Sequence, residues 1–600
     1  KELGTIMGSG GLIVMDTQTC MVDLAKYFID FCKDESCGQC TSCRIGTTRM
    51  LEVLEKISEG RGEKQDLDLL IEMGEVVKDS SFCGLGQSAP NPVLSTIRYF
   101  KDEYLDHIEN KHCDSSVCAS LFTSPCQNAC PANVDVPLYI DAIRHGDYKR
   151  AYQIIQIENP LVLVCGRVCY NLCENACNRD GIDEALAIRE LKRFASDYLL
   201  KNEDGFPIPE IEAEKDKKIA VIGSGPSGLT AAFYLRKKGY QVTIFEAETE
   251  VGGMLALGIP EYRLPKELLN EEIGVLTAMG VEIVVNTKIG KDILIEDLRE
   301  EGFWAVYLAV GAQKDRDLNI EGNEGVEGYY SALDVLKKLN QGHEFDFKDK
   351  KISVIGGGNA AIDTARNMIR LGAEEVNIIY RRTKNDMPAH KEEIKEAEYE
   401  KVNIYSQLNP YKIHSENNKI KKLECLEVKG GKFDQSGRRK PVEIKDSKLM
   451  IDTDIIISAV GQEVEDYFNK GKFKVELTKS NLIKTEGDFS TNVDWVFAGG
   501  DCVSGPSTVV ESIQQGKKAA SEIDKYLGGD GEVVKKENFE RNISSPILEE
   551  QKSRVKMPTI LLSERKRGFK EVEKGYSLDQ AVEEASRCLR CDVKEKEEVI

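Results

Sequence analysis

The sequence predicts a multidomain protein, in which α-helical, cysteine-rich modules are followed by an α/β half with two dinucleotide-binding, Rossmann-like folds. Three observations lead to this fold class. The chain has 600 residues, whereas one hydrophobic core rarely serves more than about 250–300 residues. Most of its 18 cysteines lie before residue 200. After residue 218, a strand, a glycine-rich loop, a helix and a second strand follow one another twice.

Composition limits the compartment and the partners. The net charge of −21 opposes binding to nucleic acid or to an anionic membrane surface. No apolar run approaches the roughly 18 residues of a spanning helix, and no signal-peptide pattern opens the chain. We therefore expect a cytoplasmic protein, in which thiols stay reduced and bind metals rather than form disulfides. Because the first residue is Lys1, we expect a longer polypeptide or a missing start.

The expected elements begin with helices. Apolar residues recur with helical spacing in "MVDLAKYFIDFC" and "RMLEVLEKI". Residues 201–218 are charged and contain proline, as linkers do. The two α/β units then open with the apolar strands "KIAVIG" and "KISVIG". The expected domains are two helical modules (1–112 and 113–207), the two parts of the first α/β fold (208–325 and 463–530), the inserted second fold (326–462), and a tail with a CxxC pair (531–600).

The first glycine-rich loop contains Gly223, Gly225 and Gly228. Glycines at this spacing allow a tight turn, and they let backbone N–H groups approach a pyrophosphate at a helix N-terminus. The loop follows an apolar strand and opens a helix, and Glu246 ends the next strand. A carboxylate at that position binds ribose hydroxyls. The context therefore indicates a dinucleotide site.

The second loop contains Gly356, Gly358, Asn359 and Ala361. Its second strand ends in the pair Arg381-Arg382 instead of an acid. Two guanidinium groups suit a 2′-phosphate, which predicts NADP(H) rather than NAD(H). The alternative is that both arginines are solvated surface residues.

Two such folds in one chain resemble the two-dinucleotide flavoprotein oxidoreductases. The stretches "GGMLALGIPEYRLP", "YLAVGA", "YRRTKNDMPA" and "FAGGDCVSGPSTVVESIQQGKKAA" resemble the small subunit of glutamate synthase and its relatives. The resemblance implies that the first fold holds FAD. Asp501 would lie at the ribityl–phosphate side, the helix after Pro506 would point at the flavin, and residues 258–263 would approach the isoalloxazine ring. The motifs also place Gly253, Arg263 and Gly311 among the cofactor-binding residues.

The first cysteine set comprises Cys37, Cys40 and Cys43, with Cys83 farther along the chain. CxxCxxC with a remote fourth cysteine is typical of a [4Fe–4S] cluster, and zinc is the competing interpretation. The region resembles the C-terminal part of the NADH-binding flavin subunit of complex I and related hydrogenases. The resemblance implies one cluster but no FMN site, because the preceding part of that family has no counterpart. Cys20 and Cys32 lie on apolar helical stretches, where core packing is the better interpretation.

The second set includes Cys165, Cys169, Cys173 and Cys177, one at every fourth position. Twelve residues of helix rise about 18 Å, which is too far for one metal centre to reach all four thiols. The four cysteines are therefore divided between sites, or they do not lie on one continuous helix.

The stretches "SPCQNACPANVDVP", "NPLVLVCGRVCYNLCENAC" and "AIRELKRFASD" resemble the two-cluster domain of glutamate synthase small subunits, electron-bifurcating transhydrogenases and dihydropyrimidine dehydrogenase. A further cysteine is usual where this chain has Leu121, and Cys113 or Cys165 could replace it. The fourth ligand of the second cluster stays open. The resemblance implies two ligand groups: Cys118, Cys126 and Cys177 in one, and Cys130, Cys169 and Cys173 in the other.

The last pair, Cys588 and Cys591, does not complete a metal site. The stretch "HCDSSVC" at 112–118 could supply partners for zinc, or another subunit could complete a cluster. A bare surface pair is the third possibility.

We therefore expect an NAD(P)H oxidoreductase: an iron–sulfur flavoprotein subunit with FAD, NADP(H), three [4Fe–4S] clusters and a possible zinc ion. Hydride passes between NADPH and FAD, and no side chain need act as acid, base or nucleophile. The expected setting is an electron-bifurcating transhydrogenase or hydrogenase. The expected partners are an NADH- or FMN-binding flavoprotein, ferredoxin, or a hydrogenase subunit. The alternatives are a glutamate synthase small subunit and an electron-wire scaffold without coenzyme turnover.

Overall fold

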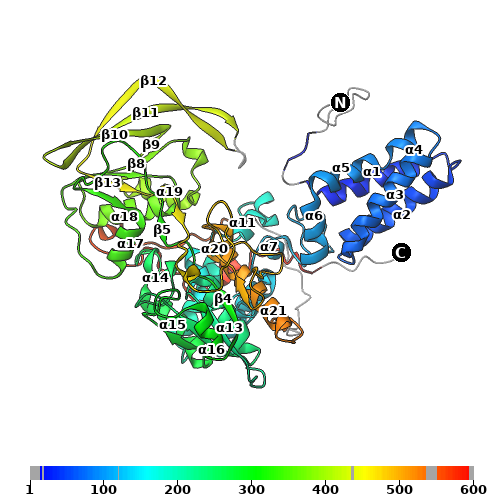
Figure 1. Ribbon diagram of the computed structural model, residues 1–600, viewed down its shortest axis with the longest axis horizontal. Helices are drawn as coiled ribbons and strands as arrows, with labels where there is room; N and C mark the ends of the chain where they lie inside the picture. The colour runs from blue at the N-terminus through cyan, green and yellow to red at the C-terminus, as the bar shows by residue number, and fades with distance from the viewer. Residues whose placement is uncertain (1–13, 17–18, 119, 434–437, 536–550, 594–600) are drawn as a thin grey trace.

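The computed structural model describes residues 14–16, 19–118, 120–433, 438–535 and 551–593. It has the predicted fold class, since helical modules precede an α/β half. Figure 1 shows the N-terminal helical module, in blue, on one side of the molecule and the sheet β10–β12 on the other. Within the described residues, no helix combines the length and the apolar character needed to cross a membrane.

The N-terminal module is a set of packed helices around an apolar core that includes Val22, Leu54 and Leu70. Its last turn is a π-helix, η1, which begins directly after α6. The elements are α1 (Met21–Asp34), α2 (Thr41–Ser58), α3 (Lys64–Ser80), α4 (Gly84–Ser88), α5 (Asn91–Tyr99), α6 (Lys101–Leu105) and η1 (Asp106–Asn110).

The second helical module breaks the regular cysteine spacing. Helix α10 ends at Val168, and Asn171 then adopts a left-handed conformation with φ +44°. Cys165 to Cys177 therefore do not share one helix, as the length of such a helix suggested. The elements are α7 (Pro125–Asn128), α8 (Val136–Arg144), α9 (Tyr148–Glu158), α10 (Val162–Val168), α11 (Leu172–Asn175), η2 (Asn178–Gly181) and α12 (Ile188–Asn202).

The first α/β fold has a five-stranded parallel sheet in the order β15-β4-β1-β2-β3. Strand β15 comes from beyond the second fold, so the second fold is an insertion in the first. The strands are β1 (Lys218–Ile222), β2 (Gln241–Phe245), β3 (Glu282–Val284), β4 (Phe303–Leu308) and β15 (Val496–Ala498). Its helices are α13 (Pro226–Lys237), α14 (Met254–Leu257), α15 (Lys266–Ala278), α16 (Ile295–Glu300), α20 (Asp501–Ser504) and α21 (Val509–Tyr526).

The second fold has its own parallel sheet in the order β6-β13-β7-β8-β9, extended by the antiparallel sheet β10-β11-β12. The chain crosses between the two folds twice. The crossing segments pair as a two-stranded ladder of β5 (Lys314–Asp315) and β14 (Gln462–Glu463). The strands are β6 (Tyr329–Ser331), β7 (Lys351–Ile355), β8 (Glu375–Tyr380), β9 (Asn403–Ser406), β10 (Leu408–Glu416), β11 (Lys419–Phe433), β12 (Arg439–Asp452) and β13 (Ile455–Ser458). The remaining elements are α17 (Ala332–Asn340), α18 (Asn359–Arg370), η3 (Lys384–Asp386), α19 (Lys391–Tyr399) and η4 (Tyr467–Lys470).

The C-terminal segment, residues 551–593, returns to the second helical module instead of extending away as a polar tail. Its helices are α22 (Leu562–Arg565) and α23 (Leu578–Ala585), and α23 packs against α8 and α12. The side chains of Arg587 and Arg590 are each only 1% exposed. Buried guanidinium groups need ionic partners, and here the second helical module supplies them: Asp183 pairs with Arg587 and Asp141 with Arg590.

Candidate functional site

A cleft of about 1060 Å³ opens where the strands of the first sheet end. In parallel α/β sheets this edge is where dinucleotides bind. The loop 223–227 forms one wall and residues 309–311 form another. Thr508 caps the N-terminus of α21 and lines the cleft together with Val509. The helix after Pro506 therefore points its partial positive charge into the cleft.

The three glycines of the first loop differ in what an added Cβ atom would meet. At Gly223, φ is +103° and a Cβ atom would lie 2.4 Å from the Ala309 carbonyl oxygen. At Gly228, a Cβ would lie 2.0 Å from the Gly223 carbonyl oxygen, so the helix could not pack this close to the strand. At Gly225, a Cβ would meet nothing within 4 Å. The loop therefore leaves bare backbone at the cleft, which fits a pyrophosphate.

Glu246 lies in the wall of the same cleft and is held by backbone and hydroxyl donors. Its Oε2 accepts a hydrogen bond from the Ser224 N–H at 3.0 Å, and its Oε1 accepts one from the Glu248 N–H at 2.9 Å. The Ser224 hydroxyl also donates to Oε2. The chain's own donors thus orient the carboxylate, as a ribose-binding group requires.

Asp501, Gly253 and Gly311 also line this cleft. The Asp501 carboxylate accepts hydrogen bonds from the Ser507 N–H and hydroxyl, both at 3.1 Å. Burial raises the pKa of Asp501 to about 6. Gly253 has φ +54°, and a Cβ there would lie 2.9 Å from the Gly225 Cα. Ile259 reaches the cleft too.

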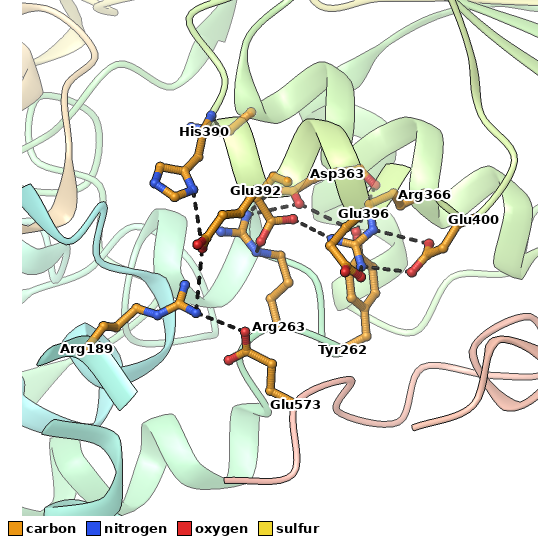
Figure 2. Close-up of polar contacts among 12 residues, drawn as sticks. Arg189, Tyr262, Arg263, Asp363, Arg366, His390, Glu392, Glu396, Glu400 and Glu573 are labelled. Atoms are coloured by element: carbon orange, nitrogen blue, oxygen red, sulfur yellow. Dashed lines mark hydrogen bonds and ion pairs between the residues drawn. The ribbon is translucent and has the colours of Figure 1, made fainter. Parts of the chain in front are cut away.

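The structure does not place Arg263 in this cleft, contrary to the expectation. Its Nη1 donates to the two carboxylate oxygens of Asp363 at 3.0 and 2.8 Å, and its Nε lies 3.3 Å from Glu393. These carboxylates belong to α18 and α19 of the second fold. A buried guanidinium needs such partners, so Arg263 faces the other domain (Figure 2).

The surrounding ion-pair network joins four parts of the chain (Figure 2). Tyr262 stacks beneath Arg370, whose guanidinium carbon lies 3.7 Å from the ring centroid. Arg370 and Arg366 both bind Glu400. From the second helical module, Arg189 reaches Glu573 of the C-terminal segment at 2.9 Å. Charged contacts therefore connect the two nucleotide folds, the second helical module and the C-terminal segment, in addition to the apolar core that the first fold shares with the last two parts.

A second cleft, of about 1240 Å³, lies at the end of the second sheet. Its glycines repeat the geometry of the first. A Cβ on Gly356 would lie 2.3 Å from the Ala459 carbonyl oxygen, and a Cβ on Gly358 would meet nothing within 4 Å. Asn359 instead fixes the local turn, because its Oδ1 accepts a hydrogen bond from the His390 N–H at 3.0 Å. Ala361 is fully buried in the core of this fold.

Arg381 and Arg382 line the second cleft, and Arg438, which directly precedes β12, joins them. The Arg382 Nε donates to the carbonyl oxygen of Arg439 at 3.1 Å, which ties the two segments together. Sequence reasoning missed Arg438, since it lies 56 residues after Arg382 and no motif marks it. Arg316 lines the cleft as well, and four guanidinium groups in one cleft favour a phosphate ligand.

The first cysteine set lies at or near the starts of two adjoining helices, α2 and α4; it comprises Cys37, Cys40, Cys43 and Cys83. Cys40 caps α2 and Cys83 caps α4. The N–H of Phe82 lies 3.4 Å from the Cys40 sulfur, and the Ser36 hydroxyl lies 3.4 Å from that of Cys43. Cys37 and Cys83 are exposed. The two loops therefore converge as ligands of one [4Fe–4S] cluster would.

Cys130, Cys169 and Cys173 lie around a buried lysine, Lys192. Burial opposes the charge of Lys192, but the adjacent sulfur groups raise its pKa above the usual range. Cys165 lies beside Cys169 in the same surroundings. It therefore does not take the place of the cysteine that is usual at the position of Leu121. Sequence reasoning missed Lys192, because a lysine in a charged helix carries no distinguishing signal.

Cys126 and Cys177 share a cavity of about 380 Å³ with Cys588 and Cys591. The structure thus does not place Cys118 in this group, contrary to the grouping that the resemblance implied, and it brings the C-terminal pair to Cys126 and Cys177 instead of to the stretch 112–118. The C-terminal pair reaches this cavity because the C-terminal segment packs back against the second helical module. There Arg179 donates a hydrogen bond to the Arg587 carbonyl oxygen at 3.0 Å. Four cysteines with one CxxC pair fit a [4Fe–4S] cluster.

Cys113 and Cys118 lie elsewhere, with Cys20 and His107. The ligand atoms of these four residues all lie within 4.8 Å of one another. Cys20 is buried, as expected for core packing, but its sulfur also lies 3.3 Å from the His107 Nε2. Sequence reasoning overlooked His107, because it forms no ligand-like pair with another histidine or cysteine in the sequence.

Three family models match the chain. The NADH-ubiquinone oxidoreductase-F iron-sulfur binding region covers residues 23–107. Dihydropyrimidine dehydrogenase domain II, a 4Fe-4S cluster domain, covers residues 97–204. The pyridine nucleotide-disulphide oxidoreductase model covers residues 217–516, which is half of the chain.

Three curated relatives are similar over much of the chain. The NADP(+)-dependent formate dehydrogenase subunit beta of Moorella thermoacetica is 35% identical, over 98% of this chain and 93% of the relative. The NADPH-Fe(3+) oxidoreductase subunit beta of Geobacter sulfurreducens is 34% identical, over 98% and 94%. The glutamate synthase [NADPH] small chain of Escherichia coli is 32% identical, over 68% and 90%.

Proposed function

The chain belongs to the pyridine nucleotide-disulphide oxidoreductase family and is an NAD(P)H oxidoreductase, and we propose that it is the NADP(H)-dependent, FAD- and iron–sulfur-containing subunit of a larger redox complex. One observation carries the proposal. The chain has two clefts with the same glycine geometry, one walled by Glu246 and the other by Arg381, Arg382 and Arg438. A carboxylate suits the ribose of FAD, and the arginines suit the 2′-phosphate of NADP(H).

In this proposal the protein binds and orients, and its cofactors carry the chemistry. When bound, FAD would supply the chemistry that converts the two electrons of a hydride into single electrons. Glu246 holds the ribose, and the start of α21 stabilises negative charge in the first cleft. The arginines hold the coenzyme in the second cleft. The pair of Arg263 and Asp363 fixes the second fold against the first, which sets how the two nucleotides approach each other.

We assign three [4Fe–4S] clusters to three groups of cysteines, which would carry single electrons between the flavin and a partner. The third group has three cysteines, and its fourth ligand stays open. The ligand sets are Cys37, Cys40, Cys43 and Cys83; Cys126, Cys177, Cys588 and Cys591; and Cys130, Cys169 and Cys173.

The proposed partners are other redox subunits: an NADH- or FMN-binding flavoprotein, ferredoxin, a hydrogenase subunit or a formate dehydrogenase subunit. Two relatives that match 98% of the chain are named as beta subunits, which supports a role within a complex. An electron-bifurcating complex of the transhydrogenase or hydrogenase type is the finer form of the proposal. We place the subunit in the cytoplasm, where reduced thiols can hold clusters.

Glutamate synthase is the weaker alternative. Its small chain matches 68% of this protein, compared with 98% for the two beta subunits. The larger coverage includes the N-terminal module, which offers an electron exit. Glutamine-dependent oxidation of NADPH by the purified complex would favour the alternative.

The test is anoxic purification of this subunit free of its partners, followed by cofactor analysis and reduction by NADPH. We expect one FAD and about twelve iron atoms per chain, from three clusters of four. NADPH should bleach the flavin absorbance and then produce cluster signals in electron paramagnetic resonance. Protein without FAD would support a scaffold instead, and eight or fewer iron atoms would remove a cluster. FMN bound to this chain would also contradict the proposal.

A further inference from the structure

Four buried side chains outside the three cluster groups converge on one point: Cys20, His107, Cys113 and Cys118. None of them is more than 6% exposed. Their ligand atoms all lie within 4.8 Å of one another. We propose that these four residues bind a single zinc ion in a closed, tetrahedral Cys₃His site.

The distances favour one ion over a cluster. Zinc–sulfur bonds of about 2.3 Å in a tetrahedron place two sulfur ligands about 3.8 Å apart. The sulfurs of Cys20 and Cys118 are 3.8 Å apart, and the Cys20 sulfur is 3.3 Å from the His107 Nε2. A [4Fe–4S] cluster binds each thiolate to a different iron, which spreads the sulfurs farther apart. A disulfide requires about 2.05 Å between its sulfurs, so these thiols are not bonded to each other.

The imidazole of His107 is oriented for metal binding. Its Nδ1 lies 2.8 Å from the carbonyl oxygen of Glu103. A carbonyl oxygen only accepts, so Nδ1 carries the hydrogen and Nε2 turns its lone pair toward the sulfurs. This arrangement is how proteins fix the tautomer of a histidine ligand. The Glu103 side chain also accepts a hydrogen bond from the Met21 N–H at 3.0 Å, next to Cys20.

The ligands come from both ends of the N-terminal module. Cys20 caps the first helix, α1, and His107 lies on the final π-helical turn, η1. Single π-helical turns are common at functional sites, because they redirect a side chain. Cys113 and Cys118 lie on the segment that leads into the second module. One ion therefore ties the start of the first module to its end and to the chain that leaves it.

The leaving segment is also held from the second module. The Nδ2 of Asn128 donates to the Cys113 carbonyl oxygen at 2.6 Å and to the Ser116 hydroxyl at 2.9 Å. Ser116 itself has φ +53°, which makes the turn between the two cysteines. Four protein ligands leave no position for water, so the site is structural rather than catalytic. Its role is to fix the first module, which carries Cys37, Cys40, Cys43 and Cys83, relative to the second.

The first test is the metal content of the anoxically purified full chain that carries FAD. We expect about one zinc ion per chain in addition to iron, measured by inductively coupled plasma mass spectrometry. Cys118→Ser and His107→Gln should each lower zinc at least tenfold and leave iron and FAD unchanged. The matched control is Cys425→Ala, which removes a buried cysteine of β11 far along the chain and should keep the zinc.

Two results would overturn the inference. One is wild-type protein with full FAD and iron but no zinc, which needs no variant to fold. The other is loss of about one cluster's iron in Cys118→Ser, which would return Cys118 to the cluster grouping implied by the family resemblance. Growth with cobalt adds a spectroscopic readout, since tetrahedral, thiolate-bound Co²⁺ has a strong visible absorption that Cys118→Ser should abolish. Reduction of FAD by NADPH should persist in that variant, so this test is independent of the proposed function.

Discussion

The Nη1 of Arg263 lies 3.0 and 2.8 Å from the two carboxylate oxygens of Asp363, and this pair joins the segment bordering the first cleft to the helix that opens the second. The side chains are 11% and 6% exposed. Removing one partner of such a pair leaves an uncompensated buried charge. The orientation of the two nucleotide folds therefore depends on a pair of charged groups, and replacing only one of them leaves the other buried without its partner.

Arg263→Ala should lower the free energy of unfolding by about 3–5 kcal/mol, because the Asp363 carboxylate would stay buried without its partner. Urea denaturation followed by flavin fluorescence and circular dichroism measures this change. The double variant with Asp363→Ala should recover part of the loss. Lys338→Ala breaks a half-exposed pair with Asp334 and serves as the control, with a loss of at most about 1 kcal/mol. Equal losses in the two single variants would show that burial of the Arg263 pair is unimportant.

Replacing both Arg381 and Arg382 with alanine should weaken NADPH binding at least tenfold and barely change NADH binding. Each charge-assisted hydrogen bond to a 2′-phosphate is worth roughly 1.5–3 kcal/mol. Arg438→Ala should have the same selectivity, since this residue lines the same cleft. Dissociation constants from flavin-reduction titrations with each coenzyme provide the measurement. Arg61→Ala removes an exposed arginine of the first module and controls for net charge. A matched loss for NADPH and NADH would make the arginine pair structural.

Cys588→Ser and Cys177→Ser should remove the same electron paramagnetic resonance signal, because both sulfurs line one cavity. Cys173→Ser should remove a different signal, since Cys173 lies with Cys130 and Lys192. All three variants should keep FAD and its reduction by NADPH. Cys502→Ser, a change at a buried cysteine of the first α/β fold, should leave both signals intact. If Cys588→Ser had a wild-type spectrum, the C-terminal pair would not be a ligand.

Glu272 should make stability depend on pH. This carboxyl group of α15 is fully buried, and it accepts hydrogen bonds from the N–H groups of Leu163 and Val164 at 2.6 and 3.0 Å. Burial raises its pKa from 4.5 to about 7. The folded state therefore binds this proton more tightly than the unfolded state, and the resulting stability is present below about pH 4.5 and is lost as pH rises to about 7.

Relative to the wild type, Glu272→Gln should gain up to about 3 kcal/mol of stability as pH rises from 4.5 to 7, because the variant has no proton to lose there. The measurement is the urea midpoint of each protein across this range. Glu271→Gln changes the exposed neighbour on the same helix and should follow the wild type. Parallel curves for Glu272→Gln and the wild type would contradict the raised pKa.

Sequence patterns alone were enough to predict the fold class and the two nucleotide loops. Strand, glycine and helix patterns are local, because backbone dihedral preferences and side-chain periodicity act over a few residues. Gly223 and Gly356 could be identified because each stands at the strand-to-helix turn of its motif, and in the structure the end of the neighbouring strand leaves no room for a side chain there. The CxxCxxC run from Cys37 is local too, since the three proposed ligands lie within a stretch of seven residues.

Which distant groups meet becomes clear only from the three-dimensional arrangement of the chain. Cys588 reaches Cys126 because buried arginines hold the C-terminal segment against the second module. Cys20 meets His107 across 87 residues, and Arg263 turns from the first cleft to Asp363. Spacing along the chain constrains which residues of one loop can share a site. Whether distant residues complete a metal site or a buried ion pair depends on the path of the whole chain. That path is set by long-range packing and by the partners that buried charges require, which no short pattern encodes.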